Sequence, residues 1–151
     1  MKFDLNETIV APATLPGTGA ITVIRMSGPD SFAVADRVVK LASGTIGTSA
    51  ANSIRFGTAC YPGGEPLDEV LVSVFRSPHS YTGEDSVEIS CHASKFIVEE
   101  LVLNCAMREH GLPNRVNSPE GHMSMARWIL LRPKQLLISS PRPARPLSEW
   151  R

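Results

Sequence analysis

Residues 53–75 read SIRFGTACYPGGEPLDEVLVSVF, and this stretch decides the fold. Two segments rich in β-branched and aromatic residues, Ser53–Tyr61 and Leu67–Phe75, lie on either side of the sequence Pro-Gly-Gly-Glu at positions 62–65. Proline and glycine side by side favour a tight turn, because proline fixes one backbone angle and glycine accepts unusual ones. The stretch therefore predicts a β-hairpin.

Similar patterns continue on both sides of this hairpin. Further strands are predicted at Thr8–Ala13, Ala20–Met26 and Ser86–His92, and helices at Ser31–Leu41 and Lys95–His110, where apolar residues recur at helical spacing. The small and polar segment 42–52 is expected to be a loop. The order β-β-α-β-β-β-α predicts an α+β domain with a mixed or antiparallel sheet and flanking helices.

Charge divides the 151-residue chain into two parts. Residues 1–112 contain 8 Lys and Arg against 13 Asp and Glu, whereas residues 113–151 contain 7 against 2. The second part also holds half of the prolines and both tryptophans. Such a change of composition within a short chain predicts a boundary near residue 111, with a basic, Pro/Arg-rich and poorly ordered tail at 112–151.

The composition excludes several protein classes. No apolar run approaches the roughly 20 residues that span a bilayer, and acidic residues precede the first apolar segment, which is not the layout of a signal peptide. The three cysteines, at positions 60, 91 and 105, have no metal-ligand spacing and are expected to be buried or half-buried free thiols in a reducing cytoplasm. We expect a cytoplasmic protein without a metal site.

Two charged residues within predicted strands are the candidate binding residues. Arg25 lies in the apolar sequence Ile-Arg-Met, and Glu88 alternates with Val87 and Ile89 and so faces away from them. Each side chain either points into solvent or binds a ligand, the guanidinium through paired hydrogen bonds and the carboxylate by accepting them from the N–H groups of a heterocycle. The sequence Gly-Thr-Gly at 17–19 lacks the G-x-x-x-x-G-K-[ST] pattern, so a turn is expected there rather than a GTP site.

Three blocks of the sequence resemble one protein family. ETIVA with AT and PG at 7–17 and VIRMSG at 23–28 form the first block, DEVL at 68–71 the second, and SYTGEDSVEI with CH at 80–92 the third. In this order and at this spacing they resemble the N-terminal domain of the tRNA-modification GTPases called MnmE or TrmE. The resemblance covers nearly all of residues 5–111.

The resemblance implies a tetrahydrofolate-binding-domain-like fold, a homodimer and a bound one-carbon folate, either 5-formyl- or 5,10-methylene-tetrahydrofolate. Arg25 and Glu88 match the family's folate-contacting arginine and glutamate. Complete family members also carry a GTPase domain and, with the FAD-containing partner MnmG, modify the wobble uridine of certain tRNAs. This chain departs from the family pattern at Ala93-Ser94, where two glycines are usual.

The tail at 112–151 does not continue the family pattern. When the codons that its residues permit are regrouped by one base, Asn114 to Pro119 give Pro-Gly-Glu-Phe-Thr, and the later residues give a family-like continuation that includes its Asn-Gly-Lys sequence. We therefore predict a frameshift after the second helix, with loss of a folate-contacting lysine. The chain is expected not to be catalytic alone. The alternatives are a stand-alone folate-dependent one-carbon transferase and a nonfunctional gene fragment.

Overall fold

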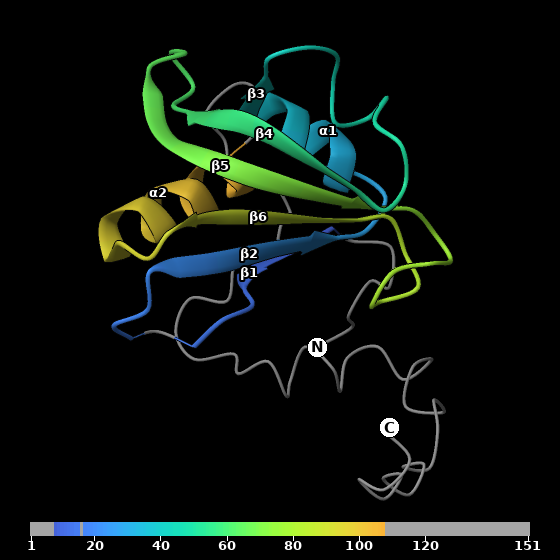
Figure 1. The fold of residues 1–151 in the computed structure, drawn as a ribbon, viewed down its shortest axis with the longest axis horizontal. Helices are drawn as coiled ribbons and strands as arrows, with labels where there is room; N and C mark the ends of the chain where they lie inside the picture. The colour runs from blue at the N-terminus through green and yellow to red at the C-terminus, as the bar shows by residue number, and fades with distance from the viewer. Residues whose placement is uncertain (1–7, 16, 108–151) are drawn as a thin grey trace, which may run out of the picture.

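The computed structural model describes residues 8–15 and 17–107 (Figure 1). These residues form a six-stranded sheet in the order β1-β2-β6-β5-β4-β3, in which every neighbouring pair is antiparallel, and two helices. The elements are β1 (Ile9–Pro12), β2 (Ile21–Ser27), α1 (Ser31–Val38), β3 (Val39–Leu41), β4 (Ser53–Cys60), β5 (Pro66–Phe75), β6 (Ser86–His92) and α2 (Lys95–Ala106). The predicted α+β class is confirmed.

Both helices cover the same face of the sheet (Figure 1). The core between them consists of alternate strand residues, because successive side chains of a strand point to opposite faces. In β5, Val70, Val72 and Val74 are almost completely buried, whereas the intervening Leu71 is 47% exposed. We call the two sides of the sheet the covered face and the open face.

The hairpin predicted at 53–75 is confirmed. β4 and β5 pair along their whole length, and the turn between them is closed by hydrogen bonds from the Tyr61 N–H to the Glu65 carbonyl and from the Gly64 N–H to the Tyr61 carbonyl, both 2.8 Å long. The turn contains Gly64 with a positive φ of 89°, a conformation that glycine adopts without strain. The predicted strand at Ser86–His92 is β6, with identical bounds.

The predicted helix at Ser31–Leu41 is wrong at its end. The helix stops at Val38, and the next three residues form the edge strand β3, which pairs with β4. Two consecutive valines suit a strand as well as a helix, so the apolar spacing alone did not mark the change. The partner of Leu41 in β4 is Gly57, where a Cβ atom would come within 2.8 Å of Val39 Cγ1, so the missing side chain allows β3 to approach.

The predicted helix at Lys95–His110 is confirmed from Lys95 to Ala106. Residues 108–110 and the tail at 112–151 lie outside the described residues, so the boundary near residue 111 stays a prediction. The three cysteines are buried free thiols, as expected. Within the described part of the chain, no helix is long and apolar enough to cross a membrane.

Candidate folate site on the open face

The two candidate residues lie side by side on the open face of the sheet. β2 and β6 are neighbours, and their register places Arg25 directly opposite Glu88. The residues next to each along its strand are completely buried on the covered face: Ile24, Met26, Val87 and Ile89. Strand alternation therefore directs both charged side chains to the open face, as the sequence predicted for Glu88.

Arg25 and Glu88 form an ion pair that is largely shielded from water. Arg25 donates from Nε to Glu88 Oε1 over 2.7 Å, and Nη2 lies 2.5 Å from the same oxygen. The side chains are 17% and 23% exposed. Within residues 8–15 and 17–107, no group donates a hydrogen bond to the second oxygen, Oε2. The pair therefore presents a fixed carboxylate oxygen that can accept a ligand's N–H.

The loop between β5 and β6 reaches back to this ion pair. The ring of Tyr81 stacks on the guanidinium group of Arg25, with its centroid 4.7 Å from Arg25 Cζ. Sequence reasoning did not single out Tyr81, because the contact depends on how the loop folds over the sheet. The signal available was its place within the family-like block SYTGED at 80–85.

Hydroxyl and carboxylate groups hold this loop in place. Ser27 Oγ donates to Glu84 Oε2 over 2.9 Å, so its single proton is used, and Thr82 must donate across the 2.6 Å contact to Ser27 Oγ. Asp85 Oδ1 accepts a hydrogen bond from the Ser77 N–H over 2.9 Å. Glu84 and Asp85 therefore have a structural role in closing the loop.

A second polar pair lies at the other end of β6. His92 Nδ1 is 2.7 Å from Asp68 Oδ1, and the His92 N–H donates to Asp68 Oδ2 over 2.9 Å. The imidazole is 70% exposed, whereas the adjacent Cys91 is buried, so the two side chains point to opposite faces of the sheet. The Asp68 carboxylate thus fixes the start of the connection to α2.

Burial disfavours the thiolate form of two cysteines, Cys91 and Cys105. Burial, with the Asp68 carboxylate adding to it, raises the pKa of Cys91 to about 11. Burial raises the pKa of Cys105 to about 12. Because the thiolate is the nucleophile, neither cysteine is equipped for covalent catalysis. Among the described residues there is also no cluster of three or more His, Cys, Asp or Glu side chains that could hold a metal ion.

Large apolar side chains lie exposed on the open face beyond the ion pair. Ile54 is 68% exposed, Phe56 is 58% exposed and Leu71 is 47% exposed. Phe56 and Leu71 are direct partners across the β4–β5 ladder, and Ile54 lies two residues before Phe56 on the same face. We call these three residues the open-face patch.

Comparisons with known proteins agree with the architecture and with the resemblance. Residues 8–119 match the family model described as GTP-binding protein TrmE N-terminus. Proteins named tRNA modification GTPase MnmE are 45% identical over 98 residues in Parabacteroides distasonis, 46% over 109 in Moorella thermoacetica and 42% over 103 in Chloroflexus aurantiacus. These alignments cover 64%, 69% and 68% of this chain, but 21%, 24% and 22% of the relatives.

The antiparallel sheet with two helices on one face, and an arginine–glutamate pair on the other, make this an α+β domain with a polar site on its open face. Because the family model matches well over half of the chain, the chain belongs to the TrmE N-terminal family. It spans about a fifth of the length of the curated relatives that it matches.

Proposed function

We propose that this domain binds a one-carbon tetrahydrofolate on its open face, forms a homodimer, and serves the modification of wobble uridine in tRNA. The observation that carries the proposal is the Arg25–Glu88 ion pair with an oxygen available for a ligand. The family match supports the link to tRNA modification, because the relatives are named tRNA modification GTPases.

The donor set of the site fits a folate. The pterin ring of a folate carries neighbouring N–H groups, which suit a carboxylate acceptor such as Glu88. Arg25 holds the carboxylate in a fixed position, because two of its nitrogens contact Oε1. A bound folate would supply a one-carbon unit, whereas Arg25 and Glu88 would bind and orient it.

The open-face patch supports the homodimer. Three large apolar side chains in register on neighbouring strands make a contiguous hydrophobic surface, which marks an interaction site more often than a free surface. A second copy of the chain would present the same patch, and a two-fold interface pairs identical surfaces. We propose that the two copies cover the patch together.

We propose that the activities of the complete relatives belong to a whole protein of which this chain represents one domain. The GTPase reaction, the FAD-containing partner MnmG and the tRNA substrate would depend on regions that the relatives possess outside the matched fifth. For the chain itself, we propose the cytoplasm as its location and folate binding with dimerisation as its contribution. We also propose that the segment at 112–151 is an out-of-frame reading of the gene.

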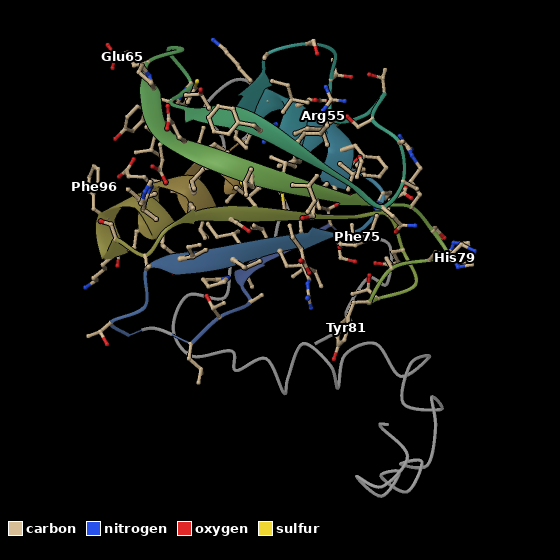
Figure 2. All side chains as sticks on the ribbon, viewed as in Figure 1. Arg55, Glu65, Phe75, His79, Tyr81 and Phe96 are labelled. Carbon is tan, nitrogen blue, oxygen red and sulfur yellow. The ribbon has the colours of Figure 1, made fainter. Side chains whose placement is uncertain are left out.

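Calorimetric titration of 5-formyltetrahydrofolate into the chain tests the folate site. We expect binding by the wild type, and a loss of roughly tenfold or more in affinity for Arg25→Ala and for Glu88→Ala, since each change removes a charge-assisted contact. Arg55→Ala and Glu65→Ala are the matched controls (both residues are labelled in Figure 2), because Arg55 bonds to the Ser43 carbonyl and Glu65 lies at the β4–β5 turn, whereas the ion pair joins β2 and β6. Equal binding by all five proteins would contradict the proposed site.

A further inference from the structure

Tyr81 is the outermost side chain of the open-face site. Its ring covers the guanidinium of Arg25 at 4.7 Å and is itself 57% exposed, whereas the ion pair beneath it is less than a quarter exposed. An aromatic ring that keeps this much exposed surface gains free energy when a ligand covers it. The ring therefore has one face on Arg25 and much of the remainder available for contact.

The backbone on both sides of Tyr81 is fixed. Thr82 is 7% exposed and donates to Ser27 Oγ, and Ser80 Oγ donates to the Glu84 carbonyl over 2.5 Å. The Gly83 N–H also donates to the Ser80 carbonyl over 3.2 Å. The side-chain torsions of Tyr81 can change without breaking these hydrogen bonds, so the ring can adjust to a ligand while the loop stays in place.

We propose that Tyr81 forms an aromatic wall of the Arg25–Glu88 site and stacks on the planar ring of the bound ligand. The inference rests on the proposed folate function and adds to it a binding residue. Glu88 and Tyr81 are both attached to the same guanidinium group, one by hydrogen bonds and one by its ring face. A planar heterocycle whose N–H groups reach Glu88 Oε2 therefore lies beside the Tyr81 ring, where offset stacking is favourable.

If Tyr81 binds the ligand by stacking, its aromatic ring should matter for affinity and its hydroxyl group should not. Tyr81→Phe keeps the ring, so its affinity for 5-formyltetrahydrofolate should stay within about twofold of the wild type. Tyr81→Ala and Tyr81→Leu lose the ring, so both should bind roughly three- to tenfold more weakly. Leucine retains bulk at this position and serves as the second variant if alanine disturbs the loop.

The control is His79→Ala. His79 is exposed on the same loop, and Figure 2 shows it on a different part of the loop from Tyr81. This variant should bind as the wild type does. The thermal unfolding midpoint without ligand separates a stacking role of Tyr81 from a purely structural one. If the ring only supported the ion pair, its removal would lower this midpoint, and the wild type would leave the ligand's ultraviolet absorbance unchanged on binding.

Calorimetry with absorbance difference spectra of the bound ligand is the experiment. We expect the wild type and Tyr81→Phe to shift the pterin absorbance on binding, and Tyr81→Leu to lose that shift together with affinity. If the wild type binds and the affinities of Tyr81→Leu and Tyr81→Ala stay within twofold of it, the role of Tyr81 is overturned. The proposed folate function is then unaffected. Absence of binding by the folded wild type overturns the folate function and this inference with it.

Discussion

The covered and open faces of the one sheet differ in what their residues do. On the covered face, Val72, Val74 and Ile89 are wholly buried beneath the helices. On the open face, a shielded ion pair lies beside exposed Phe56 and Leu71. The same strands supply both faces. Their covered-face side chains stabilise the domain, and their open-face side chains are available for a ligand and a partner.

The largest expected effect is on the free energy of unfolding, when one side chain is shortened on each face of the sheet. Ile89→Ala should lower the free energy of unfolding by about 2–5 kcal/mol, since it leaves a cavity in the core. Leu71→Ala should lower the free energy of unfolding of the monomer by less than about 1 kcal/mol, because Leu71 is already 47% exposed in the single chain. Urea unfolding measures both, and equal losses would contradict the assignment of faces.

A charge on the open face tests whether that face meets a second copy. Phe56→Glu should raise the dissociation constant of the homodimer roughly tenfold or more, because a carboxylate without a partner would be buried at the interface. Sedimentation velocity over a concentration series measures the change, with Leu103→Glu as the control on the exposed surface of α2. A dimer that persists with Phe56→Glu would place the interface elsewhere.

The edge of the sheet offers a test of close packing on the covered face. Gly57→Ala should destabilise the protein by about 1–3 kcal/mol, because the added Cβ would meet Val39 Cγ1 at 2.8 Å and the Lys40 carbonyl at 2.9 Å. Gly63→Ala, in the hairpin turn, meets nothing within 4 Å and should change stability by less than about 0.5 kcal/mol. Thermal unfolding of the two variants compares them, and similar midpoints would argue against the pairing of β3.

The smallest effect concerns the buried thiols and pH. The pKa of Cys91 is raised to about 11 and that of Cys105 to about 12, so the folded state holds these protons more tightly than the unfolded chain, where a thiol has its ordinary pKa of 9.0. Their contribution to stability is complete below pH 9.0 and is lost as the pH rises through 11 to 12. Urea unfolding should show this decline in the wild type and less of it in Cys105→Ala, whereas an equal decline would contradict it.

Much of the fold was predictable because it follows local patterns. The hairpin at 53–75 and the strand at 86–92 follow from β-branched residues between turn signals, and alternation gave the orientation of Glu88. β3 was missed because the paired valines at 38–39 fit a helix as well as a strand, and only the absent side chain of Gly57 shows that a strand can pack there.

The site was predictable only in part. The resemblance supplied Arg25 and Glu88, and the sheet register brings them together. The stacking of Tyr81 on Arg25 joins residues 56 positions apart and depends on the closed β5–β6 loop, which no periodic pattern encodes. The reading-frame hypothesis for 112–151 stays a prediction, and sequencing of the gene tests it: a confirmed in-frame tail without the shifted continuation would contradict it.

The most direct test of a folate site on the open face is the NMR signal of the Arg25 Nε–H group during titration with 5-formyltetrahydrofolate. This group donates to Glu88 Oε1 over 2.7 Å, so its chemical shift reports on the ion pair itself. We expect a saturable shift of this signal, while the methyl signals of Val72 and Val74 on the covered face stay unchanged. An unchanged Arg25 signal with saturating ligand, or shifts confined to the covered face, would contradict a folate site on the open face.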